Sequence, residues 1–149
     1  MSARHHSNAQ ALARTAERDA LAEALARHAP RGAVRIAEAL AAVAMNRRRR
    51  RERLWNGVFA DGPFADGPFA DAERRFDSAF AGLAEQPIGT RADAAWNAIC
   101  RRIAARALAG AGPDPSSGAI CATAAEAPSP AEAPRLAARL GDFAFYRGD

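Results

Sequence analysis

The densest group of chemically active side chains in this sequence is a run of five arginines, Arg47–Arg51, followed by Glu52 and Arg53. Guanidinium groups contact phosphates, so one interpretation of the run is a small helical protein that binds nucleic acid. The other is a solvated basic helix end, because the helix dipole stabilises each C-terminal cation by about 0.3–1 kcal/mol. The sequence has no helix-turn-helix or basic-zipper pattern and no interleaved aromatics, which favours the second interpretation.

Residue types that bind metals or act as nucleophiles are few and poorly spaced. Cys100 and Cys121 belong to no CxxC or Cys/His pattern, so we expect no zinc site, and two free thiols unless the protein is exported. Asp61, Asp66 and Asp71 recur in a tandem FADGP repeat, but the repeat lacks the ligand density of a calcium loop. The sequence also lacks a phosphate-binding glycine loop, a GxSxG elbow and an HExxH motif. We therefore expect neither a metal nor a cofactor.

Helices are expected to position any site in this chain. The 149 residues suffice for one domain, with 49% hydrophobic and 26% charged types. The chain has 42 alanines, and all 21 basic residues are arginine. Both residues favour helices, so an all-β fold is excluded and the expected class is mainly α, an all-α domain with long irregular loops. Such usage is also typical of a bias in the coding DNA, so the net charge of +4 identifies no partner by itself.

Apolar periodicity predicts two helices in the first third of the chain, separated by a break at residues 30–32. The first covers about residues 9–27 and follows a flexible segment at 1–8. Its apolar side carries Leu12, Leu21, Leu25 and His28. The second covers about residues 33–53, and its apolar stripe carries Ile36, Leu40 and Val43.

The remainder alternates between loops and helices. An irregular loop at 56–71 contains the FADGP repeat, and a short helix at 72–83 presents Phe76, Phe80 and Leu83 on one face. Thr90 is the expected N-cap of a longer helix that ends at Gly110. Residues 112–118 form a turn-rich loop, and residues 122–134, rich in Ala, Pro and Glu, predict a mobile loop. The aromatic tail at 136–147 should dock on the domain.

Three segments, in this order, carry a family resemblance. Residues 39–47 read ALAAVAMNR, residues 103–110 and 113–119 read IAARALAG and PDPSSGA, and residues 140–147 read LGDFAFYR. These segments resemble blocks of the SleB/CwlJ-type cell wall hydrolases. The resemblance covers about residues 12–147 and implies one small lysozyme-like or lytic-transglycosylase-like helical domain at 9–149. Its implied activity is cleavage of the glycan strands of peptidoglycan.

The resemblance also implies a glutamate that protonates the leaving oxygen of the glycosidic bond. Ungapped counting from Asn46 places this acid at His28, where the chain has no carboxylate. The nearest Glu-Ala pair makes Glu23 the candidate catalytic residue, although a solvated carboxylate on a helix face is the favoured interpretation of Glu23, and Glu17 lies farther away. The block that carries two histidines in the family has Cys121 and Thr123 here.

The resemblance further implies four residues that contact or shape the substrate site. Asp114 and Ser117 would shape the loop, and Tyr146 and Arg147 would either line the groove or lock the tail. The expected partner is therefore peptidoglycan, bound by a monomer. Two alternatives stay open besides a muralytic glycosidase or lytic transglycosylase of reduced or lost activity: a non-catalytic peptidoglycan-binding or remnant protein, and the nucleic-acid-binding protein already described.

The sequence predicts no membrane-spanning segment. The N-terminus lacks the apolar region of a signal peptide, and the most apolar stretch, residues 36–45, is too short to cross a bilayer. The default expectation is a soluble cytoplasmic protein, or a protein of the cell envelope if another route exports it.

Overall fold

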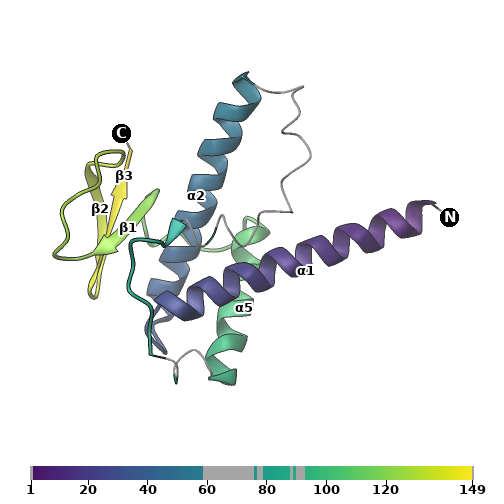
Figure 1. The fold of residues 1–149 in the computed structure, drawn as a ribbon, viewed down its shortest axis with the longest axis horizontal. Coiled ribbons are helices and arrows are strands. Elements are labelled where there is room, and N and C mark those ends of the chain that lie inside the picture. The colour runs from purple at the N-terminus through teal and green to yellow at the C-terminus, as the bar shows by residue number, and fades with distance from the viewer. Residues whose placement is uncertain (1, 59–75, 77–78, 88, 90–92, 149) are drawn as a thin grey trace.

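The protein combines helices with a small antiparallel sheet (Figure 1). The computed structural model describes residues 2–58, 76, 79–87, 89 and 93–148. The helices within this part are α1 (Ser2–His28), α2 (Val34–Val58) and α5 (Ala94–Leu108). The strands are β1 (Cys121–Ala124), β2 (Arg135–Leu140) and β3 (Phe143–Arg147). Helices hold about half of the chain, which confirms that they dominate the fold, whereas the sheet corrects the prediction of an all-α domain.

Among the residues of α1 whose burial is described, 8–28, the buried ones lie in the C-terminal half of the helix. Leu21 and Leu25 are fully buried, as their spacing predicts, and Leu12 on the same predicted side is 72% exposed. The expectation for Leu12 is wrong because the N-terminal half of α1 projects beyond the helices that cover the rest of it (Figure 1). The helix also begins at Ser2, so the segment expected to precede it is helical in the structure.

Alanine makes the close approach of the helices possible. Leu40 and Val43 of α2 are fully buried, as predicted, and many of their neighbours in the core are alanines with exposures of 8% or less. Because the methyl side chain of alanine is small, the three helices can pack closely against one another. Each alanine also removes little apolar surface from water, so this core stabilises the fold less than a leucine-rich one.

Helix α5 has well-formed ends. The Asp93 side chain accepts hydrogen bonds from Ala95 N at 2.9 Å and Trp96 N at 3.1 Å, so Asp93 is the N-cap and the prediction of Thr90 is wrong. At the other end Gly110, with φ of 73°, follows the C-cap residue Ala109. Gly110 N and Ala111 N donate to carbonyl oxygens in the last turn, which completes a Schellman motif and confirms the predicted helix end.

The sheet lies in the part of the chain that was expected to be a mobile loop and a docked tail. Its strand order is β1-β3-β2, with both pairs antiparallel. Cys121 and Leu136 both pair with Tyr146, and β2 has a bulge between Leu136 and Ala138. Residues 122–124 are therefore part of a strand, which corrects the prediction of a loop from 122 to 134. The sequence does not indicate β1 and β2 as strands because alanine, a weak strand former, recurs in both.

Both faces of β3 are covered. Phe143 and Phe145 join the core that the helices form, and the sheet stands beside α2 (Figure 1). Tyr146 and Ala144 point to the opposite face, where they pack with Cys121 and Ala133. The aromatic tail is therefore docked, as expected, and it docks as the central strand.

Two further predictions fall mostly outside the described residues. Of the predicted loop at 56–71, residues 59–71, with the FADGP repeat and its aspartates, lie outside the described residues. Residues 56–58 belong to α2, which corrects the predicted loop at these three positions. Of the predicted helix at 72–83, the three residues expected to share a face, Phe76, Phe80 and Leu83, are described and are all buried.

Candidate functional site

Two of the segments that carry the resemblance, residues 39–47 and 113–119, meet at Asn46 of α2. Asn46 Nδ2 donates a hydrogen bond to the Ala119 carbonyl oxygen at 3.0 Å and to Asp114 Oδ2 at 3.3 Å. Ala119 is fully buried and leads directly into β1. Asn46 therefore joins α2 to the loop between α5 and the sheet, and we call Asn46, Asp114, Ser116 and Ala119 the Asn46 junction.

Asp114 organises the loop around itself. Its Oδ1 accepts hydrogen bonds from Ser116 N at 3.0 Å and from the Ser116 hydroxyl, and its Oδ2 accepts one from Gly118 N at 2.9 Å. Burial raises the pKa of Asp114, but the hydrogen bonds from Ser116, Asn46 and Gly118 outweigh it and lower that pKa below its ordinary value. Ser117 lies at the tip of the loop with φ of 57°, a conformation that the surrounding hydrogen bonds impose.

Arg47 joins the same helix to the start of the sheet. Its Nη1 donates to the Ile120 carbonyl oxygen at 3.1 Å, and lies 3.6 Å from Cys121 Sγ and 3.9 Å from Glu132 Oε1. The Cys121 thiol also donates to Glu132 at 3.4 Å. Burial raises the pKa of Cys121, and the Glu132 carboxylate raises it further. The first arginine of the run is therefore a structural residue of the fold.

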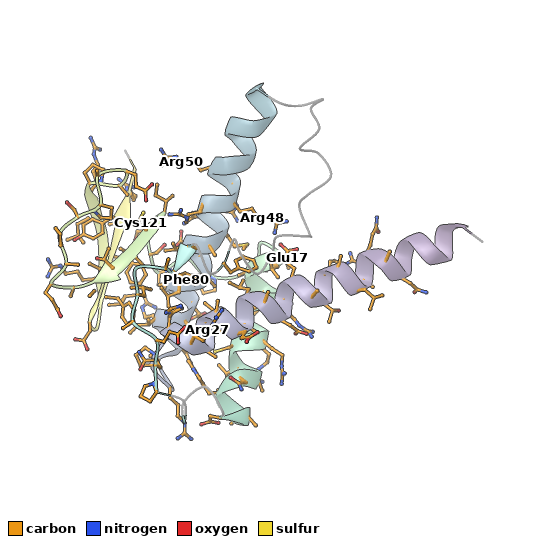
Figure 2. The ribbon with its side chains drawn as sticks, in the orientation of Figure 1. Glu17, Arg27, Arg48, Arg50, Phe80 and Cys121 are labelled. Carbon is orange, nitrogen blue, oxygen red and sulfur yellow. The ribbon has the colours of Figure 1, made fainter. Side chains whose placement is uncertain are left out.

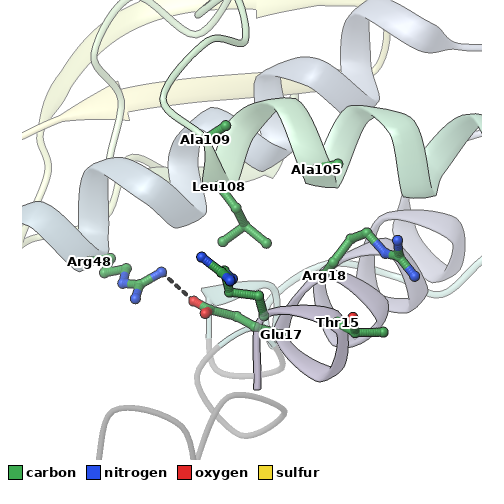
Figure 3. A pocket seen from close by; sticks show the side chains of 8 residues that line it. Thr15, Glu17, Arg18, Arg48, Ala105, Leu108 and Ala109 are labelled. Atoms are coloured by element: carbon green, nitrogen blue, oxygen red, sulfur yellow. Dashed lines mark hydrogen bonds and ion pairs between the residues drawn. The ribbon is translucent and has the colours of Figure 1, made fainter. Parts of the chain in front are cut away.

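Arg48 points to the other side of α2. Its Nη1 forms an ion pair with Oε1 of Glu17, a carboxylate of α1 whose side chain is 8% exposed (Figure 3). The pair borders a cavity of about 410 Å³ that α1, α2 and α5 line together, which we call the Glu17 cavity. Leu108, Ala105 and Ala109 of α5 form part of its wall (Figure 3).

Arg49 and Arg50 remain exposed, and they share a second cavity with Arg147. This cavity measures about 440 Å³, and we call it the arginine pocket. It is lined by residues of α2, of the loop before β1 and of the end of β3, namely Asn46, Arg49, Arg50, Gly118, Ile120, Arg147 and Gly148. Figure 2 shows Arg50 on the side of α2 toward the sheet and Arg48 on the side toward Glu17. Arg47–Arg50 thus occupy three different surroundings, and because α2 continues to Val58 they do not form the solvated helix end that the sequence predicts.

The two residues considered for the catalytic acid lie elsewhere. Glu23 is exposed on α1. His28 is 6% exposed at the end of the same helix, with its ring centroid 5.6 Å from that of Phe80 and Nδ1 at 3.3 Å from the Ala84 carbonyl oxygen. Neither residue lines the arginine pocket or the Glu17 cavity.

The other predicted site residues divide into two groups. Asp114 and Ser117 shape the loop beside the arginine pocket, and Arg147 lines that pocket. Tyr146 is 7% exposed and packs in the outer cluster of the sheet with Cys121. Of the two roles considered for Tyr146, its surroundings match a core residue that locks the tail.

The described residues contain no group of three or more His, Cys, Asp or Glu side chains that could hold a metal ion. Within the same ranges, no helix is both long and apolar enough to cross a membrane. Cys100 and Cys121 are both buried and both free, and burial raises the pKa of the Cys100 thiol to about 12. A buried thiol with so high a pKa is a weak nucleophile.

Two features of the site were missed by reasoning from the sequence. The first is the ion pair of Glu17 with Arg48, for which the only signal was a charged residue on the buried side of a predicted helix. The second is the arginine pocket, because Arg50 and Arg147 are far apart in the sequence and meet only through the unpredicted sheet. A search of protein-family models, of curated proteins and of solved structures finds no match for this chain.

Proposed function

We propose that this chain binds peptidoglycan without cleaving it, as a divergent protein of the cell-wall-hydrolase type. The observation that carries the proposal is the Asn46 junction, where residues of the first and second resembling segments bond to each other. The third segment supplies β3, whose last residue, Arg147, lines the pocket next to that junction. Segments with a shared function are expected to meet in space, and these three do.

The chemistry of glycoside cleavage supports the absence of catalysis. The acid that protonates the leaving oxygen must keep its proton near neutral pH, usually through apolar burial beside the substrate. Glu23 has no such surroundings because its side chain is exposed to water. Glu17 is buried, but its carboxylate accepts a hydrogen bond from the Arg48 guanidinium, so its surroundings are not the apolar ones that this reaction requires.

The charge of the site supports a polymer of acidic groups as the partner. The arginine pocket has three guanidinium groups and no carboxylate among its described lining residues. Peptidoglycan carries carboxylates on its peptide stems, so its attraction to this surface follows from charge. A role at the cell wall would place the chain in the cell envelope.

The nucleic-acid alternative is disfavoured by the fate of the arginine run. Arg47 and Arg48 are engaged with Ile120 and Glu17, so they are not free to follow a phosphate backbone. Among the first four arginines of the run, only Arg49 and Arg50 are exposed. Arg49 and Arg50 are adjacent helix positions that point about 100° apart, so these four arginines do not present one continuous basic row to a nucleic acid.

A zymogram on purified peptidoglycan, together with sedimentation of the protein with insoluble sacculi, tests the proposal. We expect the wild type and the Glu23→Gln variant to sediment with sacculi equally and to leave the zymogram uncleared. Clearing by the wild type that Glu23→Gln abolishes would contradict the proposal and identify Glu23 as the acid. Failure of the wild type to sediment would contradict the binding function itself.

A further inference from the structure

The arginine pocket gathers positive charge from two distant parts of the chain. Arg49 and Arg50 come from α2, and Arg147 comes from the end of β3. Among the described residues, none forms an ion pair with these three side chains. In contrast, the two preceding arginines of the run each have an oxygen partner within the protein. Within the described residues, the pocket is therefore a site where three arginine side chains converge and no carboxylate lines the space.

Glycine at position 148 leaves room for the Arg50 side chain. A Cβ atom added at Gly148 would lie 2.7 Å from Arg50 Nη1, which is closer than van der Waals contact permits. A Cβ atom at Gly118 would make only an ordinary contact with Arg147 Cδ, at 3.6 Å. The Arg50 guanidinium thus rests directly over the backbone that follows β3, and this placement depends on the missing side chain of Gly148.

We propose that the arginine pocket binds a carboxylate group, and that its ligand is the peptide stem of peptidoglycan. The second half of this statement rests on the proposed function. The planar guanidinium fork pairs with a carboxylate through two parallel hydrogen bonds, and several such groups around one cavity overcome their mutual repulsion when an anion enters. A volume of about 440 Å³ accepts a group the size of an amino-acid residue, larger than an inorganic ion.

The choice of a carboxylate over a phosphate follows from the polymer. Guanidinium groups bind both carboxylates and phosphates, so the side chains of the pocket do not by themselves distinguish the two anions. The glycan and peptide of peptidoglycan carry their negative charge as carboxylates, whereas phosphate comes from attached polymers or from nucleic acid. Experiments with both anions separate these sources.

The first experiment uses the full chain and intact sacculi. Arg50→Gln combined with Arg147→Gln is expected to weaken sedimentation with sacculi at least tenfold. The matched control is Arg101→Gln with Arg102→Gln, which removes the same charge from exposed positions on α5 and should change binding less than twofold. Sacculi whose carboxyl groups have been converted to amides should bind the wild type as weakly as untreated sacculi bind the pocket variant.

A second variant changes the pocket without changing its charge. Gly148→Ala is expected to displace the Arg50 guanidinium and to weaken binding at least threefold, with a thermal midpoint close to that of the wild type because Arg50 is a flexible surface side chain. Equal binding by Gly148→Ala and the wild type would show that the position of Arg50 does not matter, which contradicts the proposed geometry.

Calorimetric titration of the wild type with citrate and with inorganic phosphate distinguishes failure of the pocket from failure of the proposed function. Citrate binding that the Arg50 and Arg147 substitutions abolish, without sedimentation on sacculi, would preserve the carboxylate site and reject peptidoglycan as its ligand. Sedimentation that the pocket substitutions leave unchanged would reject the site and preserve the proposed function. Binding of phosphate but not of citrate would overturn the carboxylate assignment.

Discussion

Asp114→Ala tests the organisation of the Asn46 junction. The substitution removes the acceptor for the backbone N–H and the hydroxyl of Ser116, a residue with 0% exposure. A buried donor left without an acceptor costs about 1–3 kcal/mol. The donors on Gly118 and Asn46 are less costly, since Gly118 is exposed and Asn46 keeps the Ala119 carbonyl oxygen. The expected loss in the free energy of unfolding is therefore about 2–4 kcal/mol.

Thermal and urea unfolding followed by circular dichroism measure this loss. For a chain of this length, about 2–4 kcal/mol corresponds to a fall in Tm of roughly 5–15 °C. Asp114→Asn is the matched control, because it keeps one oxygen for Ser116 and should lose about half as much. A free energy of unfolding for Asp114→Ala within about 0.5 kcal/mol of the wild type would refute the reasoning, because it would mean that the loop does not depend on this carboxylate.

The pH dependence of the free energy of unfolding, compared between the wild type and Asp114→Asn, is a second test of the Asp114 hydrogen bonds. The pKa of Asp114 is lower in the folded state than its ordinary value, which is about 3.9 in an unfolded chain. Ionised Asp114 therefore stabilises the fold above that unfolded value, and its contribution is lost as the pH falls through the folded pKa. The difference in stability between the wild type and Asp114→Asn should shrink across this acidic range. A difference that stays constant down to the acid transition would contradict the assigned hydrogen bonds.

Three further predictions concern buried groups. Glu17→Ala should destabilise the fold by about 2–4 kcal/mol, because Arg48 loses its carboxylate, and the loss should exceed that of Glu17→Met combined with Arg48→Met, both measured by urea unfolding. Iodoacetamide at pH 8 should label Cys100 in the unfolded chain at least tenfold faster than in the folded chain, as mass spectrometry reports, because a pKa of about 12 leaves almost no thiolate; equal rates would contradict its burial. His28→Glu places a carboxylate at the position that ungapped counting from Asn46 gives for the acid. Because this position is buried, the substitution should lower the thermal midpoint, and it should produce no clearing in a zymogram. Clearing would show that this position faces substrate.

The helices were accessible from the sequence because their apolar residues recur at helical spacing. Leu21, Leu25, Leu40 and Val43 occupy the core as their periodicity predicts. The boundaries were less accurate, and α1 extends to Ser2, because alanine and arginine have high helix propensity at exposed positions too. Leu12 shows the related limit: periodicity gives the face of a helix but not how much of its length a partner covers.

The sheet could not be predicted because β1 and β2 lack the β-branched and aromatic residues that are typical of strands. β2 reads RLAARL and β1 reads CATA, with few β-branched or aromatic residues. These segments are strands because they pair with β3, whose aromatic residues bury both faces. Strand formation here is thus decided by long-range pairing, which a local pattern does not reveal.

The candidate site could be predicted only in part. The resemblance implied roles for Asp114, Ser117 and Arg147, and the structure places the first two in one loop and Arg147 in the arginine pocket beside it. It did not reveal that consecutive arginines divide among three surroundings. That division follows from the 100° rotation between neighbouring helix residues, and it depends on which elements pack on each side of α2. Position in a tertiary fold, and not residue type, separates Arg47 and Arg48 from Arg50.

The central claim, binding to peptidoglycan without cleavage, is tested most directly by centrifuging wild-type protein with purified sacculi after prolonged incubation. We expect the protein to be recovered in the pellet and the supernatant to contain no soluble glycan fragments. Protein left in the supernatant would contradict binding. Glycan fragments in the supernatant would contradict the absence of cleavage.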